Sequence, residues 1–284
     1  MTNLQVVLAH LGMDHFIPTV LSGGSINQVY LLQNASKSYV LKLTGTDCTQ
    51  SMLQAEADGL LTIHAAGSIR TPTIYQQDSI GDFAFLLMEY VPSTRHLDAS
   101  FGTKFGRQLA ALHQKTAPQY GYHSPNFIGS LPQPNRFHSS WVDFYISERL
   151  LPQWESASAS GFFQSSHQRQ FDHFTRMLSS LLNEEKPSLL HGDLWNGNYL
   201  ASITGDPVLI DPAVYFGHRE IDLAMSLLFG GFPDSFYEGY REAFPLEKGW
   251  QERIPIYQLY YLLVHVNLFG SSYVPSCLDV IRQF

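Results

Sequence analysis

The segment from His191 to Asn198, with the sequence HGDLWNGN, constrains this chain more than any other part of it. Asp193 and Asn198 stand in the D-x-x-x-x-N spacing of a loop that transfers phosphoryl groups. An apolar run follows and ends at Asp211. In sites of this kind, one carboxylate accepts the proton of a hydroxyl, while the asparagine and a second carboxylate hold Mg²⁺ on nucleotide phosphates. The spacing therefore predicts Asp193 as the base and Asn198 and Asp211 as metal ligands.

Length and charge limit the classes of protein to which the chain can belong. Its 284 residues are enough for two lobes or domains, and 44% hydrophobic and 15% charged residues are typical of a globular protein. The net charge of −8 disfavours binding to nucleic acid or to an anionic membrane. We therefore expect neither as a partner, and the sequence leaves the oligomeric state open.

Cysteine content and the N-terminal sequence bear on location. Cys48 and Cys277 are far apart and form no disulfide framework. The first twenty residues show no signal-peptide pattern, and the apolar stretch 256–269 is too short and too polar to span a bilayer, so it predicts a buried helix. We expect a cytoplasmic protein.

Periodicity divides the chain near Pro92. Before it, two strands (29–32 and 39–43) joined by a polar turn form a hairpin pattern, a helix is predicted over 51–64, and a strand over 83–88. After it, helices are predicted over 141–151, 162–182, 219–229, 236–244 and 256–269, with a loop at 156–160. Phe101, Phe105, Leu109 and Leu112 make a further apolar helix face. The pattern predicts an α+β protein with a small β-rich lobe (1–91) and a larger α-helical lobe (92–284).

A glycine-rich string and a lysine–glutamate pair are candidates for binding phosphates. Gly23, Gly24 and Ser25 would let a backbone approach phosphate oxygens closely, although a Gly-Gly pair also marks an ordinary turn. Lys42 lies in a predicted strand, and Glu56 interrupts the apolar face of a predicted helix, where a carboxylate usually needs a partner. Together they would orient an ammonium toward the phosphates. The alternatives are a lysine on a solvated sheet face and a glutamate that reaches water.

The connector between the lobes is a candidate for binding adenine. Glu89, Tyr90 and Val91 end the last strand before Pro92. Main-chain groups at such a hinge become free to pair with an adenine edge. An edge strand that stops at a proline has the same pattern, so this alternative stays open.

Two further residues are predicted to support the 191–198 loop. His191, two residues before Asp193, is better placed to pack and position the loop than to act as a base. Asp222 adjoins the apolar face of the helix predicted over 219–229 and could accept N–H groups from the loop. A carboxylate that interacts with the dipole of the first helical turn is the alternative for Asp222.

These strings together resemble the fructosamine (ketosamine-3-) kinase family, relatives of the aminoglycoside phosphotransferases within the protein-kinase-like fold. The resemblance also rests on the strings at 126–129, 132–135 and 211–225. Trp195 and the string that begins at Asp211 distinguish this family from aminoglycoside and choline kinases. Asp211-Pro212-Ala213 stands where protein kinases have Asp-Phe-Gly, which suits the small-molecule branch.

The resemblance implies ATP- and Mg²⁺-dependent phosphorylation of O3 of a ketosamine, an adduct of a sugar with lysine or another amine. The 3-phosphate is unstable, so the reaction removes the glycation. Lys42 would bind the phosphates with Glu56 holding it, and Glu89 and Val91 would contact adenine through the main chain.

The residues that contact the substrate are less constrained by the sequence. Trp195, His265 and Asn267 are candidates for lining the substrate pocket, with a core role as the alternative. A kinase for an aminoglycoside, choline or a similar amino alcohol, and a nucleotide-binding pseudokinase, remain the alternative functions. The sequence leaves the preferred sugar open, and likewise whether the substrate is free or protein-bound.

Overall fold

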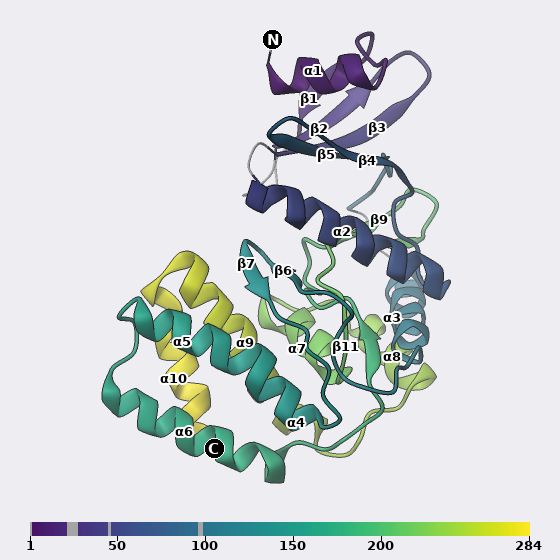
Figure 1. Ribbon diagram of the computed structural model, residues 1–284. Coiled ribbons are helices and arrows are strands. Elements are labelled where there is room, and N and C mark those ends of the chain that lie inside the picture. Colours follow the sequence, from purple (N-terminus) through teal and green to yellow (C-terminus); the bar gives the residue numbers. More distant parts are fainter. Residues whose placement is uncertain (1, 22–27, 45–46, 96–98) are drawn as a thin grey trace.

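The computed structural model describes residues 2–21, 28–44, 47–95 and 99–284, and it has two lobes (Figure 1). The N-terminal lobe is built on a five-stranded antiparallel sheet with the order β1-β2-β3-β5-β4. Its elements are α1 (Asn3–His10), β1 (Ile17–Val20), β2 (Gln28–Gln33), β3 (Ser38–Leu43), α2 (Asp47–Ala66), β4 (Ile74–Ile80) and β5 (Phe83–Glu89). In Figure 1, α1 lies on one side of the sheet, and α2 runs between the sheet and the second lobe.

The alternation of side chains along β5 gives the sheet two apolar faces. Phe85 and Leu87 pack with the α1 side of the lobe, whereas Leu86 and Met88 pack with residues of α2. Lys42 pairs with Leu86 in the sheet register, and directly opposite residues share a face. The fold therefore points Lys42 toward α2.

The predicted hairpin is confirmed as β2 and β3. Its turn is stabilised by Asn34, whose side-chain oxygen accepts the N–H groups of Ser36 and Lys37 at 2.9 and 2.8 Å.

The C-terminal lobe is mainly helical. Its strands are β6 (Asn126–Ile128), β7 (Leu131–Gln133), β8 (Ser188–Leu190), β9 (Tyr199–Ala201), β10 (Pro207–Leu209) and β11 (Tyr215–Gly217). Its helices are α3 (Ala99–His113), α4 (Trp141–Phe144), α5 (Leu151–Ala159), α6 (Ser165–Leu181), α7 (Glu220–Leu228), α8 (Asp234–Ala243), α9 (Trp250–Phe269) and α10 (Val274–Gln283). The predicted apolar face of α3 is confirmed as part of the core. None of the helices in the described ranges has the length and apolar character that a membrane span requires.

Three expectations about the helices need correction. The loop expected at 156–160 is wrong, because α5 continues to Ala159. A π-helical stretch from Tyr145 to Leu150 joins α4 to α5, so the helical region extends beyond the predicted end. α9 begins at Trp250 rather than at Ile256, and it contains Pro255. Pro255 is the sixth residue of the helix, so its missing N–H removes one intrahelical bond, the one to the main-chain oxygen of Gln251.

Candidate active site

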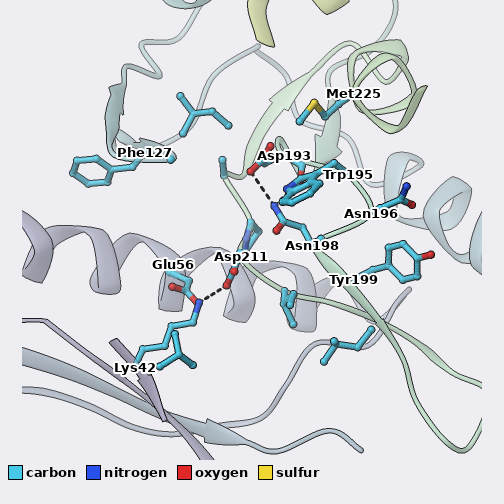
Figure 2. A pocket seen from close by; sticks show the side chains of 18 of the residues that line it. Lys42, Glu56, Phe127, Asp193, Trp195, Asn196, Asn198, Tyr199, Asp211 and Met225 are labelled. Carbon is cyan, nitrogen blue, oxygen red and sulfur yellow. Dashed lines mark hydrogen bonds and ion pairs between the residues drawn. The ribbon is translucent and has the colours of Figure 1, made fainter. Parts of the chain in front are cut away.

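A cavity of about 1550 Å³ opens between the two lobes. Among the predicted site residues that the structure describes, all but Asn267 line it. Figure 2 shows Lys42 and Glu56 on the side of the N-terminal lobe, with Asp193, Asn198 and Asp211 across from them. Gly23, Gly24 and Ser25 lie outside the described residues, so their predicted role stays a prediction.

Lys42 binds two carboxylates at once. Its Nζ lies 2.6 Å from Oε1 of Glu56 on α2, which confirms the predicted pair, and it also contacts Oδ1 of Asp211 (Figure 2). The Lys42 and Glu56 side chains are only 11% and 13% exposed, so both alternatives in which they reach solvent are wrong. The contact with Asp211 joins the N-terminal lobe to the end of the β9–β10 hairpin.

Charge interactions within this cluster set its ionisation. Burial raises the pKa of Glu56 to about 7, although the Lys42 ammonium opposes the rise. Burial alone would also raise the pKa of Asp211, but Lys42 outweighs that effect and holds the pKa below its usual value. Burial acts to lower the pKa of Lys42, whereas Glu56 and Asp211 raise it above its usual value. At neutral pH, Lys42 is therefore charged and Asp211 is ionised.

Asp222, on α7, holds the start of the 191–198 loop. Its Oδ2 accepts the N–H of His191 at 2.7 Å, and its Oδ1 accepts the N–H of Gly192 at 2.9 Å. The Asp222 side chain is fully buried, so both bonds lie away from water. These contacts confirm the predicted support of the loop by Asp222.

His191 positions the loop from within. Its Nδ1 accepts the N–H of Asp193 at 3.2 Å, which leaves Nε2 to donate to the main-chain oxygen of Ile210 at 2.9 Å. Burial lowers the pKa of His191, so the ring is neutral at pH 7. With both nitrogens engaged by the main chain, His191 ties the loop to the segment before Asp211, as predicted.

Asp193 has the environment of a base that works near neutral pH. Burial raises its pKa to about 7, although the hydrogen bond from Asn198 opposes the rise. Asn198 Nδ2 donates to Asp193 Oδ2 at 2.9 Å and to the main-chain oxygen of Asp193 at the same distance. No hydrogen bond within the described residues reaches Asp193 Oδ1. The carboxylate is therefore oriented through one oxygen, and the other is free to accept a proton.

Asp211 follows β10 in an uncommon backbone conformation. Its φ is 52°, in the left-handed region that non-glycine residues rarely adopt. The preceding residue, Ile210, donates its N–H to the main-chain oxygen of Asn198 at 3.0 Å. The two predicted metal ligands are thus linked through the backbone and line the same cavity. Such strain is a common property of functional sites.

The donor atoms of Asn198 and Asp211 suit Mg²⁺. Asn198 uses Nδ2 for both of its hydrogen bonds to Asp193, and none in the described part of the chain engages Oδ1. The Asp211 side chain is 46% exposed and ionised. Amide and carboxylate oxygens are the ligands that Mg²⁺ prefers in proteins. The two residues therefore fit a magnesium site by the chemistry of their donors.

The connector offers one main-chain donor to the cavity. The Glu89 side chain contacts Arg70 and accepts the N–H of Thr73 at 3.2 Å, and the Glu89 N–H donates to the Thr73 oxygen at 2.8 Å. The Val91 N–H has no hydrogen-bond partner among the described residues. Glu89, Tyr90 and Val91 all line the cavity.

Two of the three candidates for substrate contact line the cavity, and the third does not. Trp195 is 39% exposed and lies beside Asp193 and Asn198 (Figure 2). His265 also lines the cavity, and its Nδ1 donates to the main-chain oxygen of Tyr261 at 2.7 Å. Asn267 does not line it, because its Nδ2 donates to Gln153 O and Oε1 at 2.9 and 2.8 Å, so it joins α9 to α5.

Some lining residues were not singled out from the sequence. On the side of Asp193 they are largely apolar: Met225, Phe229, Tyr261, Leu268, Phe269 and Tyr273. Most of them lie on helices, where an apolar residue that faces a cavity has the same pattern as one that faces the core. Phe127, in the middle of β6, and Met225 belong to strings that the family resemblance had marked (Figure 2).

Comparison with known proteins identifies the family. The family model described as fructosamine kinase matches residues 11–284. A protein from Enterococcus faecium, named as a probable ketoamine kinase, is 39% identical, and the alignment covers 99% of this chain and 100% of that protein. A crystal structure from Haemophilus somnus, assigned as a fructosamine-3-kinase, is similar with a TM-score of 0.86 and 31% identity, covering 99% of this chain and 96% of that one.

A more distant structure shows the wider fold. The crystal structure of a thermostable mutant of the aminoglycoside phosphotransferase APH(4)-Ia has a TM-score of 0.64 at 13% identity and covers 98% of each chain. The two-lobed, protein-kinase-like fold expected from the sequence is thereby confirmed. With a family model that spans almost its whole length, this chain belongs to the fructosamine kinase family.

Proposed function

We propose that this chain is an ATP-dependent kinase that phosphorylates the 3-hydroxyl of ketosamines, the ribulosamine and fructosamine adducts of amines, as a deglycation repair activity. The observation that carries the proposal is that Asp193, Asn198, Asp211 and the Lys42–Glu56 pair all line one cavity. The names of the Enterococcus and Haemophilus relatives, ketoamine kinase and fructosamine-3-kinase, support this class of acceptor.

Asp193 is the proposed proton acceptor. The hydrogen bond from Asn198 Nδ2 fixes Oδ2, and Oδ1 then takes the proton of the sugar hydroxyl as the hydroxyl oxygen bonds to the terminal phosphorus and the bond to ADP breaks. Because burial raises the pKa of Asp193 to about 7, the carboxylate is a better base than a solvated one and is still largely ionised near pH 7.5. Trp195 and His265 are the proposed acceptor contacts.

The nucleotide would lie on the side of the N-terminal lobe. Lys42, held by Glu56, would bind the phosphates, and the main chain at 89–91 would pair with adenine. Asn198 and Asp211 would hold Mg²⁺, which neutralises charge on the phosphates when bound. The same proposal includes a boundary between the lobes after Val91. It also includes a role for Gly23, Gly24 and Ser25 in binding the phosphates. Location in the cytoplasm stays a prediction.

The proposal is tested by turnover on a panel of acceptors. Ribulosyl-lysine and fructosyl-lysine, free and protein-bound, are compared with an aminoglycoside and choline, using labelled ATP and Mg²⁺. We expect phosphorylation of ketosamines, with the phosphate on O3 by NMR. Phosphorylation of only the aminoglycoside or choline would replace the acceptor class, and binding of Mg-ATP without turnover on any acceptor would favour a pseudokinase.

A substitution tests the role of the base. Asp193→Ala should lower kcat at least ~10²-fold, the low end for removing a positioned base. Asp279→Ala, at a 78% exposed carboxylate on α10, is the matched control and should retain wild-type turnover. Near-wild-type kcat in Asp193→Ala rules out the assigned base.

A further inference from the structure

The β6–β7 hairpin contributes a buried polar network that lies directly behind Asp211. We propose that Asn126 and Gln133, at its two ends, are positioning residues that hold Asp211 in its left-handed conformation and thereby set the geometry of the metal-binding carboxylate. This inference rests on the proposed function, because that proposal assigns Asp211 to Mg²⁺.

Asn126 and Gln133 bind the main chain just after Asp211. Asn126 Nδ2 donates to the Val214 oxygen at 2.7 Å, and Gln133 Nε2 donates to the Ala213 oxygen at 3.2 Å. The N–H of Ala213 donates in turn to the His191 oxygen at 2.8 Å. The segment after Asp211 is therefore held by the hairpin through its oxygens and by the catalytic loop through a nitrogen.

Neighbouring hydrogen bonds fix the orientation of both amides. Gln133 Nε2 also donates to Asn126 Oδ1 at 2.7 Å, and the Tyr260 hydroxyl donates to Gln133 Oε1 at 2.6 Å. Asn135 Nδ2 adds a second donor to Asn126 Oδ1 at 3.0 Å. Rotation of the Gln133 amide by half a turn would bring its oxygen against two acceptors. The network therefore has one satisfied arrangement.

A buried arginine anchors the far end of the network. Arg149 donates to Asn135 Oδ1 and to the Pro134 oxygen, both at 2.7 Å. Its guanidinium carbon lies 3.9 Å from the ring centroid of Tyr215, which follows Asp211 by four residues. Within the described ranges, no carboxylate lies within ion-pair distance of Arg149, so oxygen dipoles and aromatic rings stabilise its charge.

The conformation of Asp211 explains why such a network is needed. A non-glycine residue with a φ of 52° keeps that conformation only where the surrounding structure enforces it. Asp211 itself is 46% exposed at the cavity, and its Lys42 contact reaches only the side chain. Before Asp211, the backbone is held by the bond from the Ile210 N–H to the Asn198 oxygen. After Asp211, it is held by the buried side chains of Asn126 and Gln133, which are 4% and 1% exposed, so the hairpin supplies the restraint on that side.

The test compares the same substitution at two buried glutamines. Gln133→Glu removes both N–H donors with little change in shape, and Gln153→Glu makes the same change at a buried residue whose Oε1 and main-chain oxygen bind Asn267. Calorimetry measures the affinity for AMP-PNP with and without Mg²⁺. The Mg²⁺-dependent gain is the ratio of the AMP-PNP affinity with Mg²⁺ to the affinity without it. We expect this ratio to be roughly 10–100-fold smaller in Gln133→Glu than in the wild type, while the affinity for AMP-PNP without Mg²⁺ is unchanged. The kcat of Gln133→Glu should fall, and its KM for the acceptor should equal that of the wild type. Gln153→Glu should behave as wild type in all these measurements.

The possible results separate this inference from the proposed function. If Gln133→Glu keeps the Mg²⁺-dependent gain, or if Gln153→Glu loses it equally, the positioning role is overturned while the kinase assignment stands. If the wild type binds no Mg²⁺-nucleotide at all, the proposed function fails first.

A milder pair of variants applies if Gln133→Glu does not give a cooperative unfolding transition. Tyr260→Phe removes only the hydroxyl that fixes Gln133 Oε1, whereas Tyr145→Phe removes a buried hydroxyl that binds the Ile256 oxygen at 2.7 Å. We expect a loss of roughly 10-fold in the Mg²⁺-dependent gain for Tyr260→Phe, the lower end of the range for such support, and none for Tyr145→Phe. Equal effects of the two substitutions overturn the inference.

Discussion

Replacement of Asp222 by asparagine tests how far the catalytic loop depends on one buried carboxylate. In the native protein, each Asp222 oxygen accepts one main-chain N–H, from His191 at 2.7 Å and from Gly192 at 2.9 Å. Asparagine has the same shape but only one oxygen. One of the two N–H groups would then face the amide nitrogen, which cannot accept it.

His113 Nε2 also lies 3.2 Å from Asp222 Oδ2, but an imidazole nitrogen can donate or accept and can therefore pair with either atom of an amide. The size of the effect therefore follows from the two main-chain bonds. A buried N–H without a partner costs about 1–3 kcal/mol, and the bond that remains loses the extra strength of a charged acceptor, about 1 kcal/mol. We therefore expect Asp222→Asn to lower the free energy of unfolding by about 2–4 kcal/mol. Since Asp193 follows Gly192 directly, relief of the unpaired N–H would move the base, and a shift near 1 Å can cost ~10²-fold in rate.

Thermal unfolding and steady-state kinetics measure the two effects separately. Glu220→Gln is the matched control, because it removes another fully buried carboxylate from α7, one that binds Arg253 at 2.6 Å rather than the loop. It should lower stability and leave kcat near wild type at temperatures where the protein is folded. If Asp222→Asn lowers stability but leaves kcat within ~3-fold of wild type, the coupling of Asp222 to the position of Asp193 is refuted.

Three further results are expected. The value of kcat/KM should rise between pH 6 and 8 with a midpoint near 7, because burial raises the pKa of Asp193 to about 7 and the base acts only when ionised. Glu56 is the other group with a pKa of about 7, so the profile is measured again in Glu56→Gln. A flat profile would contradict the assignment of Asp193 as the base. Gly192→Ala should lower the melting temperature and kcat together, because φ is 84° and a Cβ would lie 2.0 Å from the Ala213 oxygen; normal thermal stability would contradict this. Asn267→Ala should lower the free energy of unfolding by about 1–3 kcal/mol, because it removes two bonds to Gln153, and it should leave the KM for the acceptor unchanged. A raised KM would indicate that Asn267 contacts the acceptor after all.

The sequence predicted those contacts in which a polar residue conflicts with its apolar surroundings. Glu56 interrupts an apolar helix face, so a cationic partner was expected, and Lys42 lies 2.6 Å away. Asp222 adjoins another such face and accepts the N–H groups of the loop. In each case, burial of a charge is costly unless a suitable partner compensates it. A single charged residue in an apolar face therefore predicts a contact with a residue that is distant in the sequence.

The contacts that were missed depend on how elements are placed against each other. The contact of Asp211 with Lys42 requires the lobes to meet at a particular separation, which no local pattern encodes. Asn267 was expected in the pocket, but it binds Gln153 on α5, after the π-helical stretch from Tyr145 to Leu150. A π-helical turn shifts the phase of all later side chains, so a period of 3.6 residues cannot predict which face of α5 meets α9.

The sharing of Lys42 between Glu56 and Asp211 has a consequence for nucleotide binding. Two of the three N–H donors of Lys42 bind Glu56 and Asp211, so the Asp211 carboxylate competes with phosphates for the charge of the ammonium, and Mg²⁺ at Asp211 would offset that competing negative charge. Asp211→Asn removes the negative charge that competes for Lys42. We therefore expect this variant to bind AMP-PNP more tightly than wild type without Mg²⁺, yet to lose the Mg²⁺-dependent gain and most of its kcat. A general structural defect would weaken binding in both conditions, so a fall in metal-free affinity would show that Lys42 and Asp211 do not compete in this way.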